Sequence, residues 1–185
     1  EKAKKVLVLG IDGLDPKLLE RYAGEGALPN FKKLMTEGEF KPLQTTMPPL
    51  SPIAWSTFIT GMDPGGHGIF DFIHRDPESV MPYMSMARSV PSSRTIKLGS
   101  WVLPLSGGGV DNLRQGRAFW QMLEERGVPT TVFRMPANFP PTESEGKSFS
   151  GMGTPDIHGT YGIFTYITDD PPVERDIGGG EIVSW

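Results

Sequence analysis

The chain has 185 residues, 37% of them hydrophobic and 22% charged, which is the balance of one globular domain spanning residues 1–185. Its 18 Lys and Arg against 22 Asp and Glu give a net charge of −4 without a basic cluster, which excludes a typical nucleic-acid-binding surface. The absence of Cys excludes disulfides and thiolate metal sites, and no apolar run approaches the roughly 18 residues of a transmembrane helix.

The first elements predicted along the chain are a strand and a helix. The stretch "KKVLVLGIDG" (residues 4–13) is a continuous apolar run that ends in Gly, Asp and Gly, which is typical of a strand buried on both faces of a parallel sheet. Asp12 then follows the carboxyl end of this strand. "DPKLLERYAGEG" (residues 15–26) predicts a helix with Asp15 as its N-cap and Pro16 in its first turn.

The same alternation continues through the rest of the chain. "LPNFKKLMTEGEF" predicts a second helix capped by Asn30 and ended by Gly38. The other predicted elements are strands at 40–46, 129–136 and 162–168 and helices at 51–61 and 116–127. Alternating strands and helices indicate an α/β fold, in which ligands bind beyond the carboxyl ends of the strands.

The stretch "PPLSPIAWSTFITG" (residues 48–61) allows two interpretations of Ser51. A serine before proline is commonly an N-cap, with Pro52 at a position whose N–H has no partner in the helix. Alternatively, Ser51 faces a phosphoryl group, because a helix N-terminus concentrates unpaired N–H groups and partial positive charge. Asp12 is similarly ambiguous, since an aspartate between glycines can simply accept N–H groups in a turn.

Four stretches occur in a familiar order: "VLVLGIDGLDP", "LPNFKKLMTEG", "PPLSPIAWSTFITG" and "DPGGHGIFDF". This succession, over residues 6 to 75, resembles the amino-terminal portion of the type I phosphodiesterase/nucleotide pyrophosphatase family of the alkaline phosphatase superfamily. The resemblance implies a core with a central, mostly parallel sheet flanked by helices, here incomplete at the carboxyl end. It also implies two divalent metal ions, zinc first and manganese or magnesium as alternatives.

The resemblance assigns roles to particular residues. Ser51 matches the nucleophile, which also binds a metal ion, and Asp12 matches the first metal-ligand aspartate. The helix that begins at Pro52 would offer the N–H groups of Ile53 and Ala54 to the transferred phosphoryl group. The implied substrate is a small phosphate ester that Ser51 attacks at phosphorus.

Two features depart from the family pattern. Ala54 stands where nucleotide pyrophosphatases have a phosphate-binding Asn, so a nucleotide diester does not follow from the resemblance, and Trp55 is a candidate for the substrate pocket. The family's further metal ligands, which include an Asp-His pair, have no counterpart in this sequence. We therefore expect a missing carboxyl-terminal segment or a second chain to supply them.

The three histidines offer few replacements for these ligands. Asp63 and His67 have metal-ligand spacing, but the Pro-Gly-Gly between them indicates a turn. Asp156 and His158 are two residues apart, and His158 is a better candidate for a loop beside the substrate than for a ligand.

The sequence thus predicts a metal-dependent phosphoric ester hydrolase of phosphodiesterase type. The alternative is a catalytically incomplete fragment or a module that binds a phosphate ligand. A phosphomutase-like activity remains open within the superfamily, whereas a sulfatase is disfavoured because no Arg follows Ser51 at the required distance. The chain's start and the habit of the family lean slightly towards a location outside the cytoplasm.

Overall fold

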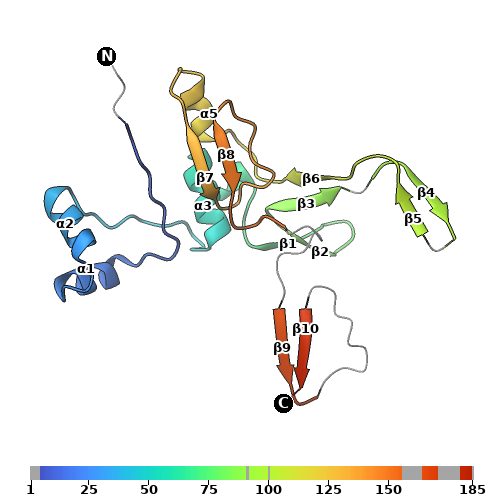
Figure 1. Ribbon diagram of the computed structural model, residues 1–185, viewed down its shortest axis with the longest axis horizontal. Coiled ribbons are helices and arrows are strands. Elements are labelled where there is room, and N and C mark those ends of the chain that lie inside the picture. The colour runs from blue at the N-terminus through green and yellow to red at the C-terminus, as the bar shows by residue number, and fades with distance from the viewer. Residues whose placement is uncertain (1–4, 91, 100, 156–163, 171–179, 185) are drawn as a thin grey trace.

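A computed structural model describes residues 5–90, 92–99, 101–155, 164–170 and 180–184 (Figure 1). Its helices are α1 (Pro16–Gly24), α2 (Pro29–Glu37), α3 (Ser51–Thr60), α4 (Pro64–His67) and α5 (Phe119–Glu124). Its strands are β1 (Ile73–Arg75), β2 (Pro82–Met84), β3 (Ala87–Val90), β4 (Thr95–Leu98), β5 (Trp101–Pro104), β6 (Gly109–Asn112), β7 (Thr131–Met135), β8 (Lys147–Ser150), β9 (Phe164–Thr168) and β10 (Gly180–Ser184).

The strands form five separate two-stranded sheets. β7 pairs with β8 and β9 with β10 in parallel, whereas β1–β2, β3–β6 and β4–β5 are antiparallel. The mixture of helices and strands fits the α/β class. The expected central parallel sheet is not present among the described residues, which contain only these small sheets.

Two predicted strands are wrong in this structure. Residues 5–11 and 40–46 are not in strands, and apolar side chains of the first segment are exposed, Val6 at 83% and Leu7 at 92%. A β-strand needs a neighbouring strand to pair its backbone N–H and C=O groups, and none of the described residues pairs with either segment. An apolar run therefore predicts a strand only where such a neighbour exists.

The helices whose ends carry strong local signals were predicted better. Asp15 caps α1, because its carboxylate accepts the N–H groups of Lys17 and Leu18 at 2.7 and 3.0 Å. α2 instead begins at Pro29 after Leu28, so Asn30 lies inside the helix and is not its cap. The predicted strands at 129–136 and 162–168 are confirmed as β7 and β9.

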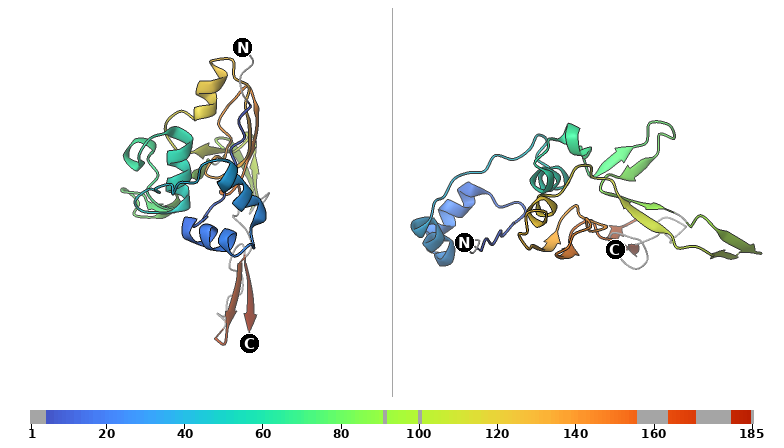
Figure 2. Two further views of the ribbon diagram at one scale, coloured as in Figure 1. Left: turned by 90° about the vertical axis from the view of Figure 1, so that its left-hand side faces the viewer. Right: turned by 90° about the horizontal axis from the view of Figure 1, so that it is seen from above.

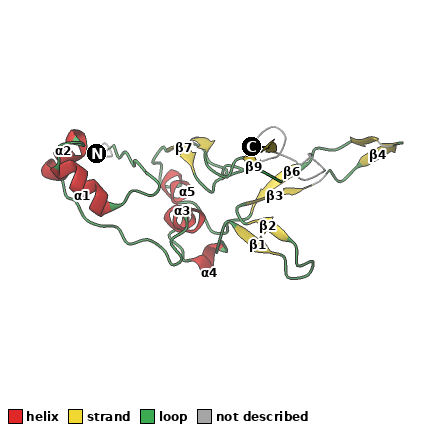
Figure 3. Cartoon of the chain, turned by 90° about the horizontal axis from the view of Figure 1, so that it is seen from below, coloured by secondary structure: helices red, strands yellow, loops and turns green. Residues whose placement is uncertain are grey.

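The core joins α3, α5 and β7, which lie together at the centre of the molecule (Figure 3). Ile59, Ala118, Trp120 and Val132 form its buried cluster. A series of edge-to-face aromatic contacts connects α3 to this core: Trp55 with Phe58 at 5.9 Å, Phe58 with Phe119 at 5.5 Å, and Phe119 with Trp120 at 5.2 Å between ring centroids. The start of α3 is therefore tied to the best-packed part of the chain.

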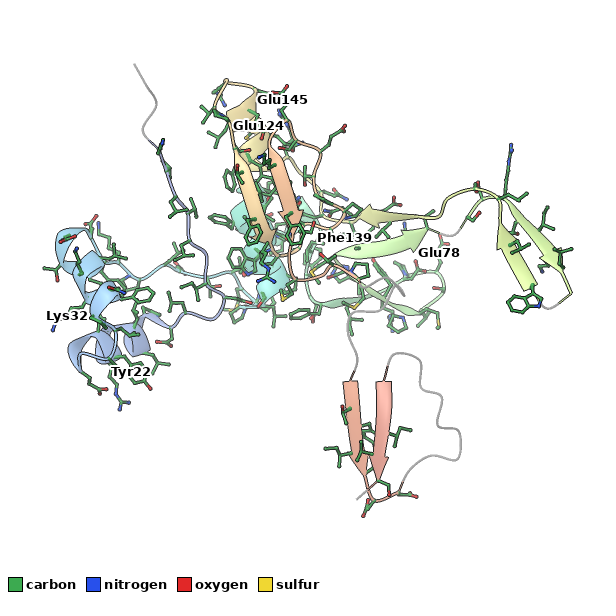
Figure 4. The ribbon with its side chains drawn as sticks, in the orientation of Figure 1. Tyr22, Lys32, Glu78, Glu124, Phe139 and Glu145 are labelled. Atoms are coloured by element: carbon green, nitrogen blue, oxygen red, sulfur yellow. The ribbon has the colours of Figure 1, made fainter. Side chains whose placement is uncertain are left out.

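Hydrogen bonds to Glu124 connect the end of α5 to the segment before β8 (Figure 4). Its carboxylate accepts hydrogen bonds from the Thr130 hydroxyl, from the Ser144 hydroxyl at 2.7 Å and from the N–H groups of Glu145 and Gly146 at 3.0 and 3.2 Å. These bonds, led by that of Thr130, lower the pKa of Glu124 below its ordinary value of 4.5, although burial opposes them. The carboxylate therefore stabilises the fold in its ionised form.

We expect Glu124→Gln to lower the Tm at pH 7, because the amide keeps one acceptor oxygen but loses the charge on which these hydrogen bonds depend. A lowered pKa means that the contribution is present above pH 4.5 and is lost as the pH falls through the folded-state value. Thermal unfolding measured from pH 7 to pH 3 should show the Tm of Glu124→Gln and that of the unchanged protein converging as the pH falls. Glu145→Gln is the control, and a difference that stays constant down to pH 3 would contradict this role of Glu124.

The chain is elongated, with the α1–α2 pair at one end and the β4–β5 hairpin at the other (Figure 2). Its accessible surface is 14465 Å², against about 8,800 Å² for a compact monomer of this mass. Many large apolar side chains are exposed; Phe133 of β7, for example, stacks on Phe149 of β8 yet is 72% exposed. Among the described residues, no helix has the length and apolarity to cross a membrane.

Candidate functional site

Ser51 opens α3, but its side chain does not cap the helix. The capping position belongs to Leu50, and no side chain hydrogen-bonds the first turn. Ser51 is the first residue of the helix and is partly buried. Within the described part of the chain its hydroxyl has no hydrogen-bond partner, so one of the two interpretations of Ser51, the capping role, has no geometric support.

Asp12 differs from the aspartates that cap α1 and α4 and from Asp76 in the loop after β1. Asp15, Asp63 and Asp76 each accept backbone N–H groups through a carboxylate oxygen. Asp12 lies in an exposed turn before Gly13, whose φ is +66°, and its carboxylate accepts no hydrogen bond from any described residue. Its oxygens are therefore available for a ligand.

Gly10 and Trp55 bring the segment with Asp12 against α3. A Cβ added at Gly10 would lie 2.5 Å from Cη2 of Trp55, so the backbone at Gly10 already touches the indole ring. Gly10 is two residues before Asp12, and Trp55 lies one helical turn after Ser51 on the same face of α3. Both oxygen-bearing side chains therefore belong to segments that meet at this contact.

The N–H groups that are free to bind a ligand at the start of α3 differ from those expected from the sequence. The N–H groups of Ile53 and Ala54 both donate to the carbonyl of Leu50, at 3.1 and 2.9 Å. A carbonyl can accept two hydrogen bonds, and Leu50 uses this capacity to close the first turn. The N–H of Ser51 itself has no acceptor among the described residues, so it is the free donor beside the hydroxyl.

His67 has a structural role. The ring is fully buried, its Nδ1 accepts the N–H of Ile69 at 3.2 Å, and its Nε2–H therefore donates to the Thr57 hydroxyl at 3.0 Å. Burial lowers the pKa of His67, and the nearby charge of Arg114 lowers it further against the opposing effect of Asp63. Asp63 caps α4 through the N–H of Gly66, so the Pro-Gly-Gly after it begins a short helix and does not form the turn expected from the sequence.

His158 and Asp156 lie outside the described residues, so their placement beside a substrate stays a prediction. Ala54 and Trp55 are both partly buried on α3, close in sequence to Ser51. The contact of Gly10 with Trp55 was not predicted from the sequence. Its only signal in the sequence is a glycine two residues before Asp12, and a glycine after an apolar run equally indicates the end of a strand.

A family model for type I phosphodiesterases and nucleotide pyrophosphatases matches residues 6–179. The chain belongs to this family. A comparison with curated proteins found no match, and neither did one with solved structures. Membership in the family identifies the general chemistry as the hydrolysis of phosphoric esters, and members of this family generally depend on metal ions.

The described residues of this family member do not make up a complete metal site. Oxygen donors such as Asp12 and Ser51 are suitable ligands for divalent cations. A zinc site, however, needs three or four protein ligands, and the described residues contain no group of three His, Asp or Glu that could hold an ion.

Proposed function

We propose that this chain provides the nucleophile of a phosphoric ester hydrolase of phosphodiesterase type, and that Ser51 is that nucleophile. The Ser51 oxygen attacks phosphorus, the bond from phosphorus to the leaving alcohol breaks, and a phosphorylated serine forms. Water then attacks the same phosphorus and restores the serine hydroxyl. The observation that carries this proposal is the position of Ser51 at the start of α3 with both its hydroxyl and its N–H unpaired within the described part of the chain.

The position of Ser51 suits a developing negative charge. The first turn of α3 carries the positive end of the helix dipole, which favours an anionic phosphoryl group. The N–H of Ser51 points from this first turn and can donate to a phosphoryl oxygen. Trp55, one turn further along, would border the leaving group, while Ala54 offers no polar group there, so a monoester and a diester are both compatible with it.

Metal dependence is part of the proposal. Asp12 and Ser51 would contact one of two divalent ions, zinc before manganese or magnesium, and such an ion would lower the pKa of the serine hydroxyl. The remaining ligands would come from a carboxyl-terminal segment or a second chain. The large exposed apolar surface supports this, because apolar surface of this extent usually lies against further polypeptide.

A direct test measures the release of p-nitrophenol from p-nitrophenyl phosphate and from bis(p-nitrophenyl) phosphate by the protein together with the carboxyl-terminal segment or second chain that completes its metal ligands. Each assay is run after chelation and then with added Zn²⁺, Mn²⁺ or Mg²⁺. We expect metal-dependent turnover of at least one ester, and the ratio of the two rates distinguishes monoesterase from diesterase activity. If no metal supports turnover of either ester, the hydrolase proposal fails for this chain and the phosphate-binding alternative replaces it.

Gly10→Ala tests whether the contact between Gly10 and Trp55 positions the site. The added methyl group overlaps the indole ring, so the ring or the segment carrying Asp12 must move. We expect kcat/KM to fall by about 10- to 100-fold, since small displacements of reacting groups have effects of this size. The Tm should change little, because the segment before Gly10 is exposed.

Gly24→Ala is the matched control for this substitution, because a Cβ at Gly24 meets nothing within 4 Å. Its activity should equal that of the unchanged protein. Equal activity of Gly10→Ala and Gly24→Ala would show that the contact with Trp55 does not position the site.

A further inference from the structure

Arg114 is a buried cation that has no counter-ion in the described part of the chain. It lies after β6, and its side chain is only 8% exposed. No Asp or Glu among the described residues lies within salt-bridge distance of the guanidinium. Burial lowers the pKa of Arg114 to about 10, so the group is still charged at neutral pH. An uncompensated buried charge costs free energy, and proteins usually pair such a group.

The hydrogen bonds around Arg114 leave several donors without acceptors. Its Nη2 donates to the Thr142 hydroxyl at 2.8 Å and to the Asn138 Oδ1 at 3.4 Å. Its Nε and Nη1, together with the amide nitrogen of Asn138, are buried and have no acceptor among the described residues. Asn138 Oδ1 is already used by the N–H and hydroxyl of Thr142. The cluster therefore has unpaired hydrogen-bond donors and would be completed by a group that carries only hydrogen-bond acceptors.

A groove of about 630 Å³ borders this cluster, and both Arg114 and Thr142 belong to its lining. The groove is formed by residues 110–116 and 140–142, that is, by β6 with the segment after it and by the loop before β8. Phe139, in this loop, lies near the middle of the molecule (Figure 4). Asp111, the acid in the lining, is exposed to solvent.

We propose that this groove binds a small oxyanion against the guanidinium of Arg114. A phosphate or carboxylate group supplies the negative charge and the acceptor oxygens that the cluster lacks, and the planar guanidinium suits two parallel hydrogen bonds to either group. Ser51 is not among the residues that line this groove, and the proposal does not depend on the proposed hydrolase activity. Its occupant would hold the loop at 138–142 against the segment after β6.

The test measures Tm while inorganic phosphate is titrated, with chloride keeping the ionic strength constant, and repeats the titration with acetate. Binding should raise the Tm by about 3–6 °C at ten times the dissociation constant. A response to phosphate alone assigns the site to phosphate groups, and a response to both anions assigns it to oxyanions in general. Absence of any response overturns the proposal.

Three variants make the assignment specific. Arg114→Met should lose the response but unfold at a similar or higher Tm in chloride, since an apolar side chain of similar size removes the unpaired charge. Asn138→Asp places a carboxylate beside Arg114, so it should raise the Tm in chloride and also abolish the response. Arg75→Met, at an exposed arginine of β1, should respond like the unchanged protein. A response that persists in Arg114→Met would place the anion elsewhere, including at Ser51.

Discussion

Replacing Ser51 by alanine is expected to lower kcat for phosphoric ester hydrolysis by at least about 10³-fold, because removal of a nucleophile leaves only binding and orientation. The same substitution should leave the free energy of unfolding nearly unchanged. A capping serine would cost about 0.5–2 kcal/mol on replacement, but Ser51 makes no cap hydrogen bond. Initial rates with a p-nitrophenyl ester and urea unfolding of the same preparations give both quantities.

Ser56→Ala is the control within the same helix. Ser56 is fully buried and its hydroxyl has no hydrogen-bond partner in the described part of the chain, so alanine removes an unsatisfied group without removing a hydrogen bond. Its activity should be unchanged. Full activity of Ser51→Ala, or a loss of activity that only follows a loss of stability, would return Ser51 to the role of a residue that starts a helix.

Trp120→Ala should cause the largest loss of stability, about 3–5 kcal/mol. The Trp120 side chain is completely buried and packs in the cluster with Ile59, Ala118 and Val132. Removing the indole leaves a cavity at the junction of α3, α5 and β7, where the chain has its main core. A loss of this size is a large share of the stability of a typical domain, about 5–15 kcal/mol.

Two further variants test the reason for this loss. Trp120→Phe should lose less stability than Trp120→Ala. The indole N–H has no partner among the described residues, and phenylalanine keeps most of the ring volume. Trp101→Ala should have little effect, since Trp101 is 75% exposed on β5. Urea unfolding followed by far-UV circular dichroism measures all three. Equal losses for Trp120→Ala and Trp101→Ala would show that the buried cluster does not dominate stability.

Helix ends that depend on residues adjacent in the sequence could be predicted. Asp15 and Pro16 begin α1, and Gly61, in the left-handed conformation at φ +68°, ends α3. Such signals act within one helical turn, so they operate in any surroundings. The pairing of strands that are distant in the sequence could not be predicted in this way, because no local signal specifies the partner strand. The hairpins between residues 73 and 112 showed no clear alternation, and the apolar segment at 5–11 found no partner strand among the described residues.

The candidate functional residues also differ in whether the sequence alone could predict them. Ser51 and Asp12 could be proposed because each stands in a short motif with its own spacing. Arg114 could not, because a single arginine in "DNLRQG" looks like an ordinary surface residue. Only the folding of the distant loop that carries Asn138 and Thr142 over it produces the burial and the unpaired nitrogens.

The two-stranded sheets have a consequence for how the chain can associate. Every strand in a two-stranded sheet is an edge strand, so each of the ten described strands presents a row of backbone groups that another chain can extend. β7 and β8 add stacked, exposed phenylalanines to such edges. A second copy of the chain can pair with these edges, so we expect aggregation of the isolated chain to begin at them.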